Sequence, residues 1–299
     1  MSFRSRTGRA LDSGFTRIWS AAGWLCGRAL PAQNRWRSDG NERVLVIAPH
    51  PDDEVAGVGG TILLHQRAGD QVTVLHVTDG RRSRAGGLAP EAMARRRYQE
   101  ARESVKALGV ARWEWLGLFE GEWADCDLAA PLERLVRELA PLVIYAPSRV
   151  DFHPEHYRVA RVTANVLGAS AQSTAAAVVR VYQIQVPLTW ILVNLVNPIL
   201  DVFPELLRVC DLYASQEGSL RSALRLKRYG ALGHRIPGVG EEFWEMTVAA
   251  YVALHASEPS RPLVETFRGL RRLSPSDPLA FLRGATERRR LARLATKKP

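Results

Sequence analysis

A histidine and three acids stand within five residues of one another, in segment 50–54, His-Pro-Asp-Asp-Glu. The segment directly follows an apolar run that ends at residue 48. Carboxylates that cluster at the end of a buried strand cost free energy unless a cation or a chemical task compensates for them. The simpler alternative is that Asp52 or Asp53 caps a helix. The density of ionisable groups favours a functional site.

A second cluster, His153 and His156 around Pro-Glu, follows another apolar run at 141–147. Both clusters therefore stand where a predicted strand ends and a predicted helix begins. In an open α/β sheet, ligands bind outside the carboxyl ends of the strands. If both strands belong to one parallel sheet, the two clusters meet at the same edge.

The residue types in these clusters suit a catalytic metal ion. His50 and Asp53 are three residues apart on a turn into a helix, so their side chains face the same way. With one of the two later histidines they form a two-histidine, one-carboxylate set that leaves a position for water, as in catalytic zinc sites. Ferrous iron accepts the same ligands. Asp52 projects differently and can take a proton from the metal-activated water, while the remaining histidine stabilises an oxyanion or protonates a leaving amine.

The elements that would position these residues alternate between strand and helix. The patterns predict strands at 43–48, 71–78, 113–118, 141–147 and 176–186, and helices at 53–67, 90–108, 127–139, 155–168, 201–228 and 240–256. This alternation is typical of β-α-β units, and we expect a mainly parallel sheet flanked by helices. We expect a single domain at 41–258, with extensions at 1–40 and 259–299.

The net charge of +10 belongs to the two extensions. Residues 1–40 carry seven arginines and two acids, residues 259–299 carry eleven basic residues and three acids, and the middle of the chain is close to neutral. This distribution argues against a nucleic-acid-binding core. Basic extensions suit peripheral contact with an anionic membrane, or are simply solvated.

The first 28 residues have one apolar helical face, and three interpretations stay open: a helix docked on the protein's own core, a helix on a membrane surface, or a secretory signal. The three cysteines are far apart and lack a CxxC spacing, which indicates a reducing compartment. No apolar run reaches eighteen residues. We therefore expect a cytoplasmic protein, with membrane association through its extensions as an open alternative.

The sequence resembles the PIG-L (LmbE-like) family of zinc-dependent N-acetylglucosaminyl deacetylases over roughly residues 43–255. The resemblance rests on APHPDDEVAGVGG (48–60), HVTDG (76–80) and HPEHYRVA (153–160), supported by RYQEARESVKALG (97–109) and LLRVCDLYASQ (206–216). It implies a Rossmann-like deacetylase fold.

Position by position, the resemblance implies that the zinc ligands are His50, Asp53 and His156. It implies Asp52 as the general base, and His153 as the group that stabilises the tetrahedral intermediate or acts as an acid. Glu155 stands where family members usually have aspartate, a mild change that should not alter ligation.

The substrate contacts are less sharply indicated. The loop after the second strand offers Arg81 and Arg82, which could grip sugar hydroxyls or a phosphate. Arg97 is a further candidate, although it could instead form an ion pair within its own helix. His234 lies in a late loop that could line the site. Acids precede the glycines of 57–60, which argues against dinucleotide binding at that run.

We therefore expect a hydrolase that removes acetyl from an N-acetylated amino sugar, carried by a small molecule or a glycolipid. Two alternatives stay open. One is an amidase acting on a thiol conjugate or a natural product through the same metal. The other is a membrane- or nucleic-acid-associated binding module that works through the basic extensions. The sequence leaves the oligomeric state open.

Overall fold

The computed structural model describes residues 38–256, except 148, 150, 152, 185–187, 189–191 and 235, together with residues 289, 290 and 293. The basic extensions, and with them the apolar face of the first 28 residues, lie outside this range apart from residues 38–40, 289, 290 and 293. The domain boundaries expected from the sequence therefore stay predictions.

Strands and helices alternate through the first half of the described chain, as the sequence predicts. The elements are β1 (Arg43–Ala48), α2 (Asp53–Ala68), β2 (Gln71–Thr78), η2 (Ala85–Gly87), α3 (Pro90–Ala107), β3 (Arg112–Leu118), α4 (Asp125–Leu139), β4 (Val143–Ala146), α5 (Pro154–Ala169), α6 (Ala171–Thr174), β5 (Val178–Tyr182), β6 (Leu195–Pro198), η3 (Leu200–Val202), α8 (Phe203–Leu212), η4 (Ala214–Gln216), α9 (Glu217–Gly233), β7 (Gly240–Thr247) and α10 (Val248–Ala256).

The described strands form one seven-stranded sheet in the order β3-β2-β1-β4-β5-β7-β6. Strands β1 to β5 are parallel to one another, and β7 runs antiparallel to both β5 and β6. Because β1 and β4 are adjacent and parallel, their carboxyl ends lie side by side. The expectation of a mainly parallel α/β sheet is confirmed.

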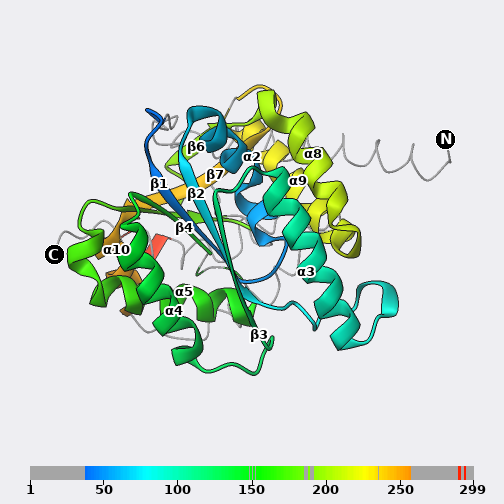
Figure 1. The fold of residues 1–299 in the computed structure, drawn as a ribbon. Coiled ribbons are helices and arrows are strands. Elements are labelled where there is room, and N and C mark those ends of the chain that lie inside the picture. Colours follow the sequence, from blue (N-terminus) through cyan, green and yellow to red (C-terminus); the bar gives the residue numbers. More distant parts are fainter. Residues whose placement is uncertain are drawn as a thin grey trace.

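Helices cover both faces of the sheet, as Figure 1 shows. On β1, Val44 and Val46 face a core built with α2, α3, α8 and α9. The alternate residues Leu45 and Ile47 face a second core built with α4, α5 and α10. This alternation follows from the two-residue period of a strand, and both faces are apolar because both are buried.

The helix predicted at 240–256 is wrong in its first half, because residues 240–247 form β7 and only the following residues form α10. Almost every side chain of β7 is buried, so the sequence shows no two-residue alternation that would mark a strand. Pairing with β5 and β6 decides the conformation. The helix predicted at 201–228 is likewise interrupted, by η4 between α8 and α9.

The glycines of α2 serve close packing. A Cβ atom on Gly57 would lie 2.2 Å from Cδ2 of Tyr182, and one on Gly60 would lie 2.7 Å from Cδ1 of Ile199. The buried ion pair of Lys227 and Glu241 also bonds to the backbone of this helix. Glu241 accepts from the N–H of Gly60, and Lys227 donates to the carbonyl of Ala56. The glycine run therefore has a structural explanation that requires no bound phosphate.

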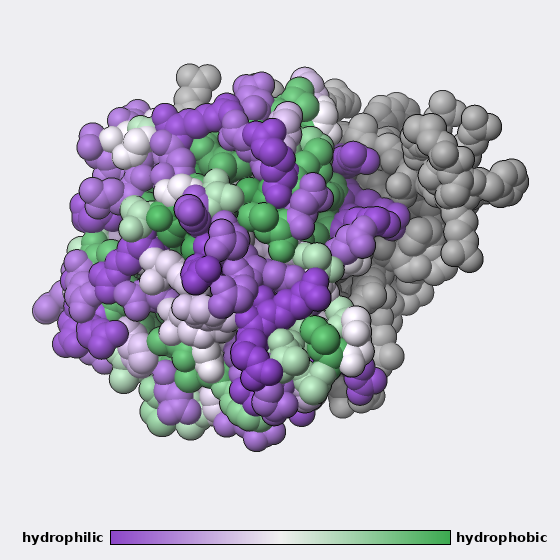
Figure 2. All heavy atoms as spheres, turned by 45° about the vertical axis from the view of Figure 1, so that its right-hand side comes forward, coloured by the Kyte–Doolittle hydropathy of each residue, from purple (hydrophilic) through white to green (hydrophobic). Residues whose placement is uncertain are grey.

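The surface of the described residues is largely polar. Figure 2 shows hydrophobic residues in patches between hydrophilic ones on one face. The exposed large hydrophobic side chains are Leu88, Phe119, Leu200, Leu207 and Leu212. Among the described helices, none combines the length and the apolar character that a membrane crossing requires.

Candidate metal centre

A tight turn between β1 and α2 holds the first cluster. The backbone N–H of Asp53 donates to the carbonyl of His50 at 3.2 Å, and the backbone N–H of His50 donates to Oδ2 of Asp53 at 2.9 Å. Asp52 has a backbone φ of 121°, a value that residues other than glycine rarely adopt. Such strained backbone tends to occur at functional sites, where the surrounding structure enforces it.

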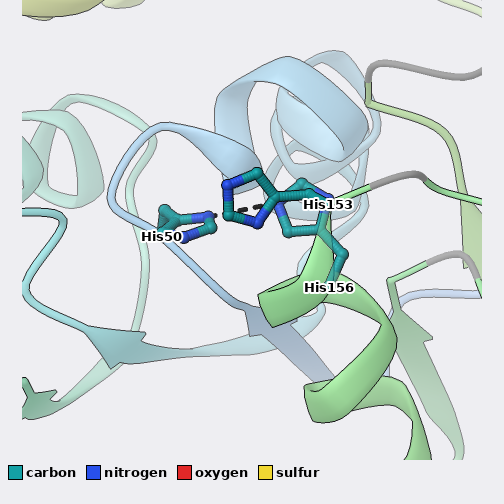
Figure 3. Close-up of side chains that lie close together, drawn as sticks. All are labelled: His50, His153 and His156. Carbon is teal, nitrogen blue, oxygen red and sulfur yellow. Dashed lines mark hydrogen bonds between the residues drawn. The ribbon is translucent and has the colours of Figure 1, made fainter. Parts of the chain in front are cut away.

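Three donor atoms from the two clusters converge at the carboxyl ends of β1 and β4. Nδ1 of His50 lies 3.1 Å from Nε2 of His156, and each of these nitrogens lies 3.2 Å from Oδ2 of Asp53. The three side chains are buried, with relative exposures of 6%, 1% and 3% for His50, His156 and Asp53. Figure 3 shows the imidazoles approaching from the β1–α2 turn and from the start of α5.

This triangle has the dimensions of a metal-ligand set. A tetrahedral zinc ion bound at about 2.0–2.2 Å keeps adjacent ligand atoms roughly 3.3–3.6 Å apart. The observed separations of 3.1–3.2 Å are slightly smaller, so a small outward movement would admit an ion. Two imidazoles and a carboxylate are ligands that zinc and ferrous iron both accept. The residues present therefore fit a divalent transition metal.

His153 also lies beside the cluster, and the three histidines together form a group of potential ligands. Its ring centroid is 4.7 Å from that of His50 and 4.8 Å from that of His156. His153 is the N-cap of α5, and its Nδ1 accepts from the backbone N–H of Glu155 at 3.3 Å. We favour Asp53 as the third ligand because its oxygen closes a regular triangle, while one nitrogen of His153 is already bonded to the helix terminus.

Asp52 contacts α3 through one oxygen of its carboxylate. Nη2 of Arg97 lies 2.5 Å from Oδ1 of Asp52, and the same guanidinium donates to the carbonyls of Pro51 and Gly80. The intrahelical ion pair considered for Arg97 is therefore not observed. Arg96 makes that pair instead, with Glu100. Arg97 thus stabilises the strained turn through these hydrogen bonds and orients the carboxylate of Asp52.

Two further carboxylates contact the outer nitrogens of the histidines. Oδ2 of Asp151 lies 3.0 Å from Nδ1 of His156, an ion-pair contact whose angle falls outside hydrogen-bond geometry. Oε1 of Glu120 lies 3.4 Å from Nε2 of His50. Carboxylates in these positions commonly orient metal-bound imidazoles and raise their basicity. Sequence reasoning missed both residues, although each follows a predicted strand.

Glu54 bonds structural neighbours rather than joining the proposed ligands. Its buried carboxylate accepts from Tyr213 and Ser104 and contacts Nε2 of His76 at 2.9 Å. It also accepts from the backbone N–H of Asp52 at 3.1 Å. Side chains from β2, α3 and the end of α8 therefore meet on one carboxylate that supports the turn.

Burial and mutual charge perturb the ionisable groups of the cluster. Burial lowers the pKa of His50, but its contacts with Asp53 and Glu120 outweigh burial and raise this pKa to about 9. Burial raises the pKa of Asp52 to about 7, although the charge of Arg97 opposes the shift. Burial, aided by the charges of His50 and His156, lowers the pKa of His153 to about 3.

The other residues expected to bind substrate lie in different surroundings. Arg81 pairs with Asp79 at 2.6 Å, and its guanidinium stacks 3.5 Å from the ring centroid of Phe119. The backbone N–H of Arg82 donates to Glu120 at 2.8 Å, which brings this loop beside His50. Nε2 of His234 lies 2.5 Å from Oε1 of Glu242 in β7. Their roles toward a substrate stay predictions.

Fold and side-chain cluster together define an α/β protein with a candidate two-histidine, one-carboxylate metal centre at the carboxyl edge of its sheet. Residues 45–167 match the family described as PIG-L, GlcNAc-PI de-N-acetylase. Over these residues the chain is therefore similar to the PIG-L (LmbE-like) deacetylase family, as the sequence motifs indicate.

Two curated relatives illustrate the similarity. The chain is 30% identical over 194 residues to a 1D-myo-inositol 2-acetamido-2-deoxy-alpha-D-glucopyranoside deacetylase of Kineococcus radiotolerans, covering 50% of this chain and 54% of the relative. It is 30% identical over 139 residues to a diacetylchitobiose deacetylase of Thermococcus kodakarensis, covering 45% and 50%. The chain thus spans about half the length of the curated relatives it matches.

Among solved structures, the fold is similar to that of N,N'-diacetylchitobiose deacetylase from Pyrococcus horikoshii in complex with its inhibitor MPG. The TM-score is 0.62 at 21% identity, over 84% of this chain and 95% of the other. At this identity the similarity concerns the fold. The named relatives are deacetylases of substrates that contain N-acetylglucosamine.

Proposed function

We propose that this protein hydrolyses the acetamide of an N-acetylated amino sugar, with a divalent metal ion held by His50, Asp53 and His156. The observation that carries the proposal is the convergence of three buried ligand atoms at 3.1–3.2 Å from one another. The names of the relatives support the reaction and the sugar, since they are deacetylases of N-acetylglucosamine compounds.

When bound, a divalent metal in such a site lowers the pKa of a water molecule and polarises a carbonyl oxygen. Asp52 is the group of this chain that takes the proton of the attacking water. The general base of a hydrolase works best when its pKa is near the working pH, and burial shifts the pKa of Asp52 upward from its ordinary value, toward that range. Arg97 and the N–H contact to Glu54 hold the turn that carries this carboxylate.

His153 is the group that faces the developing negative charge. Its Nδ1 accepts a hydrogen bond from the N-terminus of α5, so the neutral ring carries its proton on Nε2. An N–H that is already oriented stabilises a tetrahedral oxyanion without reorganisation. The same proton is available to the departing amine.

We propose zinc as the ion, with ferrous iron as the alternative, since two imidazoles and one carboxylate suit both. The buried contacts of Asp151 and Glu120 with the outer imidazole nitrogens support a positively charged occupant. An amidase acting on another amide through the same residues is the second candidate function, and a substrate screen separates the two.

The test combines metal content with acetate release. For Asp52→Asn we expect full metal occupancy and a loss of turnover of about 10²–10⁴-fold, the usual contribution of a general base. For His156→Ala we expect the loss of both metal and turnover. Acetate release is screened over N-acetylglucosamine glycolipids, inositol glycosides, disaccharides and simple amides. Undiminished turnover by the Asp52 variant would refute the mechanism, and hydrolysis of simple amides alone would replace the substrate class.

A further inference from the structure

The buried carboxylate of Glu54 has a hydrogen-bond partner for each of its acceptor positions. Its Oε1 accepts from the hydroxyl groups of Tyr213 at 2.6 Å and Ser104 at 3.0 Å. Its Oε2 lies 2.9 Å from Nε2 of His76 and accepts from the backbone N–H of Asp52 at 3.1 Å. An ionised carboxylate offers about four lone-pair positions, so this group is saturated. Whatever holds Oε2 therefore also holds the backbone of Asp52.

The tautomer of His76 follows from the contact on its other nitrogen. Nε1 of Trp113 donates to Nδ1 of His76 at 2.8 Å. Because an indole N–H is a donor only, Nδ1 of His76 accepts this hydrogen bond and carries no proton. The proton of the neutral ring is then on Nε2, from which it is donated to Oε2 of Glu54. In the other tautomer, the lone pairs of Nε2 and Oε2 would face each other.

The indole of Trp113 is fixed by packing. It is a half-buried side chain of β3, and its ring centroid lies 5.4 Å from that of Tyr98 on α3 and 5.8 Å from that of Trp115. His76 and Glu54 each have a relative exposure of 0%, so their polar atoms depend on protein partners. Loss of the indole N–H would leave Nδ1 of His76 buried without a donor, and the ring could then adopt the other tautomer.

The turn at the end of these contacts is strained. The φ of 121° at Asp52 is a conformation that persists only where the surrounding structure enforces it. Arg97 bonds the carboxylate of Asp52, whereas among the described residues the backbone N–H of Asp52 has Glu54 as its one hydrogen-bond partner. The side chain and the backbone are therefore held by different groups, and a weaker contact with Oε2 would let the backbone relax.

We propose that Trp113 and His76 are positioning residues for Asp52, the proposed general base. They act through Glu54, whose carboxylate they hold against the backbone of the turn. The proposal rests on the proposed function, in which Asp52 takes the proton of the attacking water. It deepens that function, because it makes turnover depend on an indole of β3, a strand that contributes none of the proposed ligands or catalytic residues.

The experiment removes the indole N–H and keeps an aromatic ring, by Trp113→Phe in the full-length, metal-loaded protein. The matched control is Trp115→Phe, because this second half-buried indole of β3 forms no hydrogen bond with a described residue. On an N-acetylated amino sugar, kcat should fall about tenfold in Trp113→Phe, less than the roughly 100-fold that a displacement of about 1 Å can cost. KM, metal content and the kcat of the control should stay unchanged. An unchanged kcat in Trp113→Phe, an effect on KM alone or a loss of metal would overturn the proposal.

Two further readouts do not require turnover. Imidazole ¹⁵N NMR reports the tautomer of His76, whose signals are assigned among the seven histidines with His76→Gln. Hydrogen exchange reports the backbone N–H of Asp52. In Trp113→Phe we expect a mixture of tautomers and exchange about tenfold faster, with neither change in Trp115→Phe.

These readouts separate the positioning role from the proposed function. If no acetamide is hydrolysed but the tautomer and the exchange rate change in Trp113→Phe alone, the proposed function fails and the positioning of the turn stands. If either the tautomer or the exchange rate is unchanged in Trp113→Phe, or if Trp115→Phe has the same effects, the proposal is overturned.

Discussion

The contact between Asp151 and His156 leads to a prediction about metal affinity. Oδ2 of Asp151 lies 3.0 Å from Nδ1 of His156, and both side chains are buried, with exposures of 0% and 1%. In Asp151→Asn, an amide replaces the carboxylate without changing its size. Oδ1 can still accept from the backbone N–H of His153, as it does at 3.1 Å in this structure. The lost feature is the negative charge beside the outer nitrogen of the proposed metal ligand.

The expected cost follows from the role of such carboxylates. Removal of a group that orients a metal-bound histidine typically lowers metal affinity about 10–100-fold, equivalent to roughly 1.4–2.7 kcal/mol. We expect the upper half of this range, because the amide would turn its own N–H group toward the protonated Nδ1 of His156, or force the imidazole into the other tautomer. The apo-protein is titrated with zinc in competition with a chelator of known affinity, at one fixed pH.

Glu155→Gln provides the matched control. This carboxylate is also buried at the start of α5, but it accepts from Nε1 of Trp123 at 2.6 Å and forms no hydrogen bond or ion pair with the described side chains of His50 and His156. We expect its zinc affinity to stay within about twofold of the original. Equal affinities for Asp151→Asn and the unchanged protein would refute the reasoning, because the negative charge would then contribute nothing to metal binding.

Two stability predictions follow from the packing around α2. Gly57→Ala should destabilise the protein by about 1–3 kcal/mol, because the new Cβ would lie 2.2 Å from the side chain of Tyr182. The control is Gly218→Ala in α9, whose Cβ would meet no atom within 4 Å and which should be neutral or stabilising by up to about 1 kcal/mol. Urea denaturation measures both free energies of unfolding, and equal effects of the two substitutions would contradict the packing argument. Burial lowers the pKa of His65 to about 4, against 6.5 in an unfolded chain, even though Asp70 opposes the shift. Between these values the unfolded state binds a proton that the folded state does not, so the free energy of unfolding should fall by up to about 3 kcal/mol as the pH drops from 6.5 to 4. His65→Gln should flatten that part of the pH profile, and an unchanged slope would show that another group is responsible.

Much of this architecture follows from local sequence patterns. The first strands, Arg43–Ala48 and Gln71–Thr78, have the predicted bounds, because short apolar runs between turn signals leave few alternatives. The meeting of His50 with His156 also follows from the sequence, since parallel strands place their carboxyl ends at one edge of a sheet. The residue types and positions of segments 50–54 and 153–156 are therefore sufficient to predict one shared site.

Only the tertiary structure decided the features that depend on long-range contacts. Residues 240–247 form a strand because β5 and β6 pair with them, and a fully buried strand carries no alternating pattern that would separate it from a helix. The neighbours of the histidines became visible only in the structure, where Glu120 after β3 contacts His50 and Asp151 after β4 contacts His156. A carboxylate in a loop looks the same in a sequence whether it faces solvent or an imidazole, because its partner is set by the packing of distant elements.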